Sequence, residues 1–251
     1  LEPEVGQAAF DILNAAGYDV KVLPMIGAGA SFLSKGFISQ ARDHAGKVLD
    51  AIKALDNGSG LSVVGCEPPE VYCLKHEYIA LLPERRAEIE SLTKRVWLVD
   101  EFVLRVGTFP SLTLPKIVET TGVGLLDHRI TFHPHCHQRA EGPADDGLPS
   151  GTSATVEMLR MFGFDVDLID AGCCGMAGTF GYEAEHYELS MQIGELGVLP
   201  KLREQRLENR DWSVASTGSA CRIQIRHGTG IEAKHPLELV RDVLIANSSN
   251  G

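Results

Sequence analysis

The chain has 251 residues, of which 44% are hydrophobic and 23% charged, and its formal net charge is −11 at pH 7. This composition is typical of a globular protein with one large domain or two of ordinary size. The acidic balance and the lack of a basic cluster argue against nucleic acids and anionic membrane surfaces as partners, and no apolar run reaches the ~18 residues of a transmembrane segment.

The chain begins at Leu1, inside what the pattern predicts to be a helix start, and we recognise no signal peptide. We therefore expect it to be part of a longer protein. Its six cysteines lack the dense spacing of a secreted disulfide framework. We expect a reducing, cytoplasmic location, with peripheral association with a membrane as an alternative, and thiols that serve metal or redox chemistry.

Helical and alternating apolar patterns follow one another along the first half. The predicted elements are a helix over 3–16, a strand over 18–23, a helix over 37–55, a turn at 57–60, a strand over 61–65 and helices near 69–82 and 84–104. The stretch 107–124 is expected to cross to the second half. Because strands and helices alternate, we expect parallel sheets.

The second half repeats this order. Its predicted elements are a strand over 129–132, a helix over 150–162, a strand over 164–169, a helix from 182 to about 206, a strand over 212–216 and a final helix over 235–246.

An internal repeat relates the two halves. Residues 8–20 align with 154–166 at an offset of 146 (154 − 8), which also sets Gly27-Ala28-Gly29 opposite Cys173-Cys174-Gly175. A shift to 151 sets Glu70 opposite Cys221. We therefore predict an α/β fold of two tandem pseudo-symmetric units, each a small parallel sheet flanked by helices. The expected units are 1–124, degenerate and without its opening strand, and 125–251, which holds the cysteine site.

Two adjacent thiols, Cys173 and Cys174, stand in a glycine-rich stretch between a predicted strand and a predicted helix. Neighbouring side chains of a regular strand point to opposite faces, so two such thiols converge only in a turn. Glycines allow that turn without steric cost. The simpler interpretation, two cysteines packed as small hydrophobic residues, leaves the glycines unexplained.

Two more cysteines follow strands of the second half, Cys136 after 129–132 and Cys221 after 212–216. Because parallel strands end at one edge of a sheet, we expect Cys136, Cys173, Cys174 and Cys221 to lie together there as metal ligands. Converging thiolates suit iron–sulfur clusters and zinc. The pattern does not choose between these two, since neither the C-x-x-C knuckle of zinc ribbons nor the ferredoxin spacing occurs.

Other cysteines and histidines are less specific. His133, His135 and His137 alternate beside Cys136, and each is expected to lie near the site or in solvent more readily than to be a ligand. Cys66 and Cys73 are expected to be buried bystanders. We place His227 and His235 at the surface or around the site, and expect Glu183, Glu185 and His186 on a solvated helix face.

Three segments carry a resemblance to a known family: 135–138 (His-Cys-His-Gln), 170–187 around the doublet, and 221–225 (Cys-Arg-Ile-Gln-Ile). They resemble the cysteine-rich CCG domain. This domain occurs in the B subunit of heterodisulfide reductase, in the iron–sulfur subunit of glycolate oxidase and at the carboxyl end of large FAD-linked oxidases. The first half departs from the motif, because Gly27 and Ala28 replace the doublet and Glu70 replaces a cysteine.

The resemblance implies an iron–sulfur electron-transfer module, with a 4Fe–4S type of cluster, within a flavin-dependent dehydrogenase of 2-hydroxy acids such as glycolate, D-lactate or D-2-hydroxyglutarate. FAD would be bound upstream, by a flavin-containing domain or subunit, and a quinone or another carrier would accept electrons. The chain alone is not expected to oxidise a hydroxy acid. The alternatives are a structural zinc or partner-docking domain without a redox role, and thiol–disulfide chemistry at the doublet, which ring strain disfavours.

Overall fold

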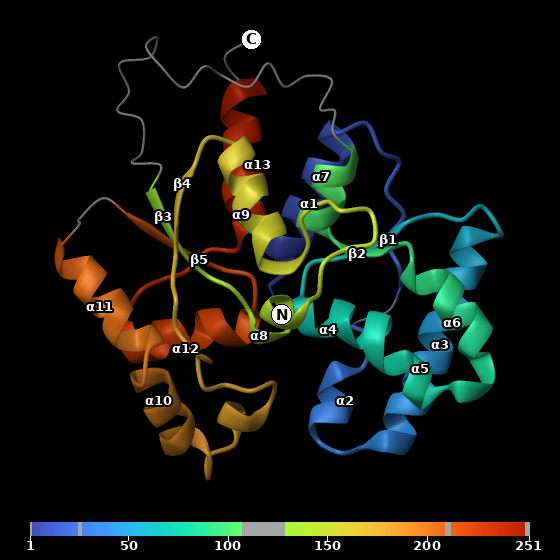
Figure 1. The fold of residues 1–251 in the computed structure, drawn as a ribbon, viewed down its shortest axis with the longest axis horizontal. Helices are drawn as coiled ribbons and strands as arrows, with labels where there is room; N and C mark the ends of the chain where they lie inside the picture. Colours follow the sequence, from blue (N-terminus) through green and yellow to red (C-terminus); the bar gives the residue numbers. More distant parts are fainter. Residues whose placement is uncertain (1, 25–26, 107–128, 209–211, 249–251) are drawn as a thin grey trace.

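The computed structural model describes residues 2–24, 27–106, 129–208 and 212–248 (Figure 1). Within them the chain is a mixed α/β protein with two small parallel sheets flanked by helices, which confirms the predicted fold class. We call residues 1–124 half one and residues 125–251 half two. The crossing expected over 107–124 lies outside the described residues.

Half one holds a two-stranded sheet, in which β1 and β2 are parallel and Val63 lies opposite Val96. Helices α2 to α6 and β2 enclose an apolar cluster of their own around the buried Tyr78 and Ile89. The elements in chain order are α1 Pro3–Ala15, α2 Ala30–Ser34, α3 Ile38–Asp56, β1 Val63–Gly65, α4 Pro68–Tyr72, the π-helical turn η1 Cys73–Glu77, α5 Tyr78–Leu81, the 3-10 turn η2 Pro83–Arg85, α6 Arg86–Thr93, β2 Val96–Leu98 and α7 Val99–Val106.

Half two holds a three-stranded parallel sheet in the order β4-β3-β5. All residues of β3 after Arg129 are buried, as expected for a central strand covered on both faces. The elements are β3 Arg129–His133, α8 Cys136–Ala140, α9 Gly151–Met161, β4 Asp165–Leu168, the 3-10 turn η3 Phe180–Tyr182, α10 Tyr187–Glu195, α11 Val198–Glu208, β5 Ser213–Ser216, α12 Ser219–Thr229 and α13 Pro236–Ser248.

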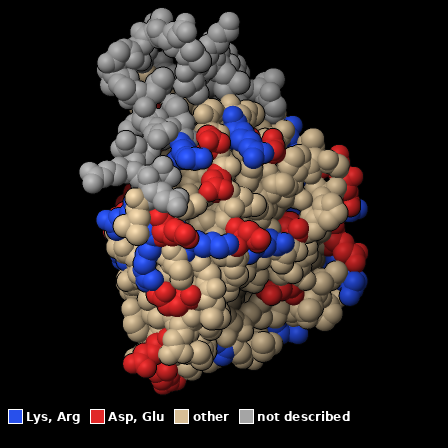
Figure 2. Space-filling view, turned by 60° about the vertical axis from the view of Figure 1, so that its left-hand side comes forward, with Lys and Arg blue, Asp and Glu red and all other residues tan. Residues whose placement is uncertain are grey.

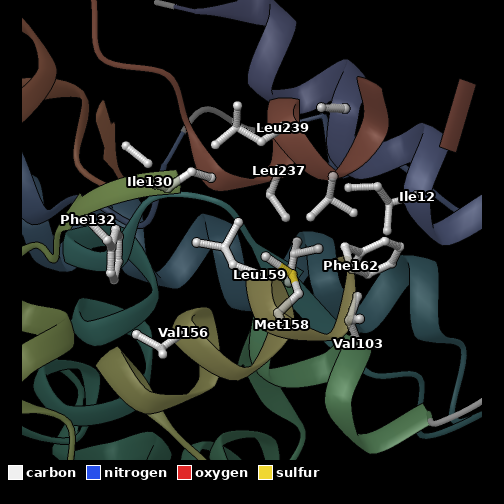
Figure 3. Packing of buried hydrophobic residues seen from close by; sticks show 14 of the residues in the cluster. Ile12, Val103, Ile130, Phe132, Val156, Met158, Leu159, Phe162, Leu237 and Leu239 are labelled. Carbon is white, nitrogen blue, oxygen red and sulfur yellow. The ribbon is translucent and has the colours of Figure 1, made fainter. Parts of the chain in front are cut away.

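Four helices join the halves in the middle of the molecule (Figure 1). The first helix of half one, α1, packs on the last helix of half two, α13, and reciprocally α9 packs on α7. Such an exchange is the arrangement of a two-fold interface. Figure 3 shows Ile12 of α1, Val103 of α7, Met158 of α9 and Leu237 of α13 in one shared cluster. Because this cluster draws on both halves, the division into separate units at residue 124 remains a prediction.

The internal repeat also appears in the backbone. Gly17 follows α1 with φ +87° and Gly163 follows α9 with φ +89°; Gly29 and Gly175 have φ +98° and +99°. Both pairs are 146 residues apart, and glycine tolerates this left-handed region best. The predicted repeat therefore holds for the first helix of each half and for these glycine angles. It fails for the strand between them, because 165–168 forms β4 whereas 18–23 forms no strand.

Some predicted elements differ. The strand predicted over 18–23 is wrong: Tyr18 and Val22 are 40% and 72% exposed, so the alternating side chains gain no burial there. The helix predicted near 84–104 is interrupted by β2, whose short apolar run resembles a buried helix segment in sequence. The helix predicted from 182 to 206 is divided into α10 and α11, and α8 and α12 occupy positions where only turns were expected.

The surface carries mixed charge. On the face shown in Figure 2, basic and acidic side chains alternate along a band, and neither sign gathers into a large patch. Among the described residues, no helix has both the length and the apolar character needed to cross a membrane.

Candidate metal centre

Three parallel strands of half two end at one edge of the sheet and deliver four cysteines to it. β3 leads into α8, which begins at Cys136; the glycine turn after β4 holds Cys173 and Cys174; and β5 leads into α12, whose third residue is Cys221. All four line one cavity of about 110 Å³. The convergence of these residues follows from the parallel topology, as the sequence predicted.

Successive contacts link the four sulfurs. At the buried end, Cys174 Sγ and Cys221 Sγ are 3.4 Å apart. Cys173 contacts Cys174 on one side and Cys136 on the other, and both Cys136 and Cys173 are exposed at the mouth. We call Cys174 and Cys221 the inner pair, and Cys136 and Cys173 the outer pair. The two pairs thus place four thiols around one cavity, two buried and two exposed.

The turn that carries the doublet requires glycine at position 175. Gly175 has φ +99°, and a Cβ on it would lie 2.0 Å from the backbone oxygen of Ser190. Ser190 Oγ donates to the Gly175 carbonyl at 2.9 Å, and Gln224 Nε2 donates to the Ser190 carbonyl at 3.0 Å. The Gly175 N–H itself donates to Cys173 Sγ at 3.3 Å. Helices α10 and α12 therefore hold the turn, and its backbone already hydrogen-bonds one sulfur.

An ion cluster ties the cysteine of α12 to half one. The buried Arg222 donates from Nη1 to the Ser216 carbonyl at 2.7 Å, and its Nη2 lies against the carboxylates of Glu2 and Glu67. Glu67 also accepts from the N–H of Ser219, in the first turn of α12. Burial raises the pKa of Glu67 while Arg222 lowers it, and burial dominates. No sequence pattern indicates this cluster, because its members lie far apart in the chain.

The neighbouring thiols set one another's protonation. Hydrogen bonds from Cys136 and then Cys174 lower the pKa of Cys173, and hydrogen bonds from Cys174 and then His133 lower the pKa of Cys221. The pKa values of Cys136 and Cys174 are raised, first by their hydrogen bonds to Cys173 and then by other thiol contacts and burial. Thiolate is the metal-binding form, so thiols of this set that are protonated would release their protons on binding a metal.

Of the three alternating histidines, two are buried and His137 is half-buried. His133 and His135 are 2% and 5% exposed, and His135 caps α8 by accepting from the His137 N–H at 3.2 Å. Burial lowers the pKa of His135. His137 stacks on Tyr72 of half one, with ring centroids 4.8 Å apart. His133 is the unexpected member, since one of its ring nitrogens lies within 4.8 Å of both inner sulfurs.

The remaining candidates lie elsewhere. His235 is buried where the halves meet, with Nε2 3.3 Å from the Cys66 carbonyl, and burial lowers its pKa to about 3. The surface alternative is therefore wrong for His235, which lies behind the site beside Thr217. Burial raises the pKa of Cys66 to about 12 and that of Cys73 as well. The expected burial is confirmed for Cys73, whereas Cys66 is half-buried. Glu183 pairs with Lys35 and with His186, while Glu185 is exposed; all three precede α10.

A second buried network lies behind α8. Gln138 Nε2 donates to Asp100 Oδ2 at 3.3 Å, Thr155 Oγ1 donates to the same oxygen, and Thr217 Oγ1 donates to Gln138 Oε1 at 2.8 Å. Burial, and to a smaller extent the neighbouring Glu101, raise the pKa of Asp100 to about 7. The Gln of the His-Cys-His-Gln motif thus links the cysteine helix to half one. Sequence patterns assign these side chains no role.

In half one the corresponding turn holds a carboxylate. Glu70 is the third residue of α4, as Cys221 is of α12, and its Oε2 accepts from the N–H groups of Ala28, Gly29 and Ala30 at 2.5, 3.0 and 3.3 Å. The predicted correspondence of Glu70 with Cys221 therefore holds in the fold. That half one binds no metal remains a prediction.

Comparison with known proteins finds oxidoreductases. The chain is 27% identical to D-2-hydroxyglutarate dehydrogenase of Escherichia coli K12 over 93% of its length and 20% of that protein, and 28% identical to the Pantoea ananatis protein of the same name over the same shares. It is 27% identical to the C subunit of the anaerobic glycerol-3-phosphate dehydrogenase of E. coli K12, over 96% of this chain and 56% of that subunit.

The chain thus spans about a fifth of the length of the D-2-hydroxyglutarate dehydrogenases and about half of the glycerol-3-phosphate dehydrogenase subunit. No family model matches it. No solved structure matches it either. The names of these relatives and the cysteine site together define an oxidoreductase-associated module with a cysteine- and histidine-lined site able to take a metal.

Proposed function

We propose that the chain is an iron–sulfur electron-transfer module of a flavin-dependent 2-hydroxy-acid dehydrogenase. The cavity of about 110 Å³ lined by all four cysteines carries this proposal. One water needs ~10–15 Å³ of such space, so the cavity has room for a group of several atoms. A structural zinc ion is enclosed by its four ligands and leaves no comparable space. A cluster of the 4Fe–4S type fits the thiolate donors and the room between them.

Each cysteine has a role in this proposal. Cys174 and Cys221 would be the buried ligands of the cluster, and Cys136 and Cys173 would be its exposed ligands. When bound, the cluster supplies one-electron transfer. The chain excludes water from the inner pair, and the Gly175 N–H hydrogen-bonds Cys173 Sγ, an interaction of the kind that tunes cluster potentials.

The partners follow from the relatives. Their names are those of dehydrogenases or of one part of a dehydrogenase, and this chain spans only a fraction of each. These fractions support a further domain or subunit; in this proposal it contains flavin, with FAD as the electron donor, and a quinone or another carrier is the acceptor. The substrate oxidised there would be a 2-hydroxy acid such as D-2-hydroxyglutarate, D-lactate or glycolate. Six free cysteines favour a reducing, cytoplasmic setting, with peripheral membrane contact as the variant.

A structural zinc site is the second candidate. It is favoured by the compact buried group of Cys174, Cys221 and His133, whose ligand atoms all lie within 4.8 Å of one another. These donors are three of the four ligands that a tetrahedral zinc ion needs.

Metal analysis separates the two candidates. The chain is purified anaerobically, reconstituted with iron and sulfide, and compared with Cys174→Ser and with Cys73→Ser as a matched control from half one. We expect several irons and acid-labile sulfides per wild-type chain, visible absorbance and an EPR signal on reduction, all retained in Cys73→Ser and lost in Cys174→Ser. Bound zinc without iron or sulfide would refute the cluster, and equal iron in all three proteins would refute Cys174 as one of its ligands.

A further inference from the structure

The last residue of β3, His133, faces the inner pair of cysteines. Successive side chains of a strand alternate between its faces. Phe132 points into the cluster shared by the halves, whereas Thr131 on the opposite face reaches Gln205 of α11. His133 lies on the same face as Thr131, the side covered by α11 and α12, and α12 carries Cys221. The strand therefore directs this imidazole toward the base of the cavity, which it lines.

The imidazole is buried and incompletely partnered. His133 is 2% exposed, and its Nδ1 has no hydrogen-bond partner within the described part of the chain. A buried polar atom without a partner costs free energy, so such atoms are uncommon and call for an explanation. His135, two residues further on, is buried to a similar degree, but its Nδ1 accepts the His137 N–H. His133 therefore keeps one buried ring nitrogen unpartnered, although the ring also hydrogen-bonds Cys221.

Its distances are those of a ligand. One ring nitrogen of His133 and the sulfurs of Cys174 and Cys221 all lie within 4.8 Å of one another, whereas the outer pair falls outside this group. With metal bonds of about 2.0–2.3 Å, ligand atoms that share a tetrahedral metal lie roughly 3.5–4 Å apart. The inner group therefore needs only a small contraction around a metal atom.

We propose that His133 is a metal ligand, so that the site offers four thiolates and one imidazole nitrogen. This inference rests on the proposed function for the identity of the metal group, but not for the presence of a metal. The inner end of the site would then have a nitrogen donor from His133 beside the two sulfurs of the inner pair. The outer end would have sulfur donors only.

Nitrogen hyperfine spectroscopy tests the assignment in the reconstituted chain. Pulsed EPR of the reduced cluster should show a directly coordinated nitrogen, whose coupling pattern changes when the protein is made with 15N-histidine. The signal should disappear in His133→Gln and persist in His135→Gln, the matched control. His133→Cys, which restores a donor, should hold wild-type iron without the nitrogen coupling. A wild-type cluster without coordinated nitrogen, or one whose coupling survives in His133→Gln, would overturn the assignment.

Cobalt distinguishes failure of this inference from failure of the cluster proposal. If no iron and sulfide bind, the cluster proposal fails, and the His133 assignment is decided by Co²⁺ alone. The wild-type chain should then show sulfur-to-cobalt charge-transfer absorption. His133→Gln should bind Co²⁺ at least about tenfold more weakly, because loss of a residue that only hydrogen-bonds a metal ligand already lowers metal affinity about 10–100-fold. Equal affinity and equal spectra in the two proteins would refute His133 as a ligand.

Discussion

The two halves use one turn for two purposes. In half two the turn around Gly175 carries cysteines and its N–H groups face sulfur; in half one the turn around Gly29 carries none and three N–H groups bind the Glu70 carboxylate. The left-handed glycines have φ +99° and +98°. In both halves this backbone turns N–H groups toward an anionic or sulfur group. In both halves the third residue of a later helix, Glu70 of α4 or Cys221 of α12, reaches the turn. In half one the group bound by these N–H groups is a side chain of the same chain, Glu70.

Replacing Cys221 by glutamate, its counterpart in half one, should have the largest effect on the iron content. Cys221→Glu gives half two the residue that half one has, removes one inner thiolate and places a carboxylate beside the cavity. We expect reconstituted iron to fall to near zero with the circular dichroism of the folded chain retained. Cys73→Ser, which changes a buried cysteine of half one, should leave iron unchanged. Full iron content in Cys221→Glu would mean that the site does not depend on the residue that distinguishes the halves.

The two glycines should differ in the cost of an added methyl group. In Gly175→Ala the Cβ would lie 2.0 Å from the backbone oxygen of Ser190, whereas in Gly29→Ala it would lie 3.2 Å from His44 Cδ2, the ring of a side chain that can move. Both carry the left-handed penalty of about 1–2 kcal/mol. We expect urea unfolding to show a loss of at least about 4 kcal/mol for Gly175→Ala and about 1–2 kcal/mol for Gly29→Ala. Equal losses would show that the backbone angle alone requires glycine.

Much of this comparison could be predicted from the sequence. The 146-residue offset placed Gly29 opposite Gly175, and the shift to 151 placed Glu70 opposite Cys221, because local pattern and turn chemistry repeat in both halves. The convergence of the cysteines followed from parallel topology, in which successive strands end at one edge.

Long-range contacts could not be predicted in the same way. The burial of His133 depends on which face of β3 meets α12. The ion cluster around Arg222 joins it to Glu2 and Glu67, each more than 150 positions away in the chain. The strand expected over 18–23 failed for the same kind of reason, since an alternating pattern does not supply a neighbouring strand. The exchange of α1 and α9 between the halves likewise has no local signal.

The contact between the halves should respond to pH through Asp100. This carboxyl accepts from Gln138 and Thr155 and is faced by Glu101 and Cys66; burial raises its pKa to about 7, against about 3.9 in an unfolded chain. Between these values the folded protein holds a proton that the unfolded chain has lost, so rising pH lowers stability up to about pH 7.

Asp100→Asn isolates this contribution. From pH 5 to pH 8 the wild type should lose about 2–3 kcal/mol more unfolding free energy than Asp100→Asn does, measured by urea denaturation at each pH. Glu88→Gln, which removes a carboxylate on α6, is the control. Hydrogen bonds to Arg85 lower the pKa of Glu88, so this substitution should leave the dependence of the unfolding free energy on pH unchanged between pH 5 and pH 8. Parallel curves for wild type and Asp100→Asn would mean that Asp100 is ionised throughout.

The smallest effect is expected where half one supplies its own anion. Glu70→Ala removes the acceptor of three backbone N–H groups and should cost about 2 kcal/mol, since buried donors lose their partner but water can enter from the part-exposed side. Glu70→Gln keeps one carbonyl oxygen at the turn and should cost about 1 kcal/mol. Glu84→Ala, which breaks an exposed pair with Arg42, is the control and should stay within about 0.5 kcal/mol. If Glu70→Ala were as mild as the control, the N–H groups would be satisfied by water, and the turn of half one would not need the anion that its counterpart takes from the cysteines.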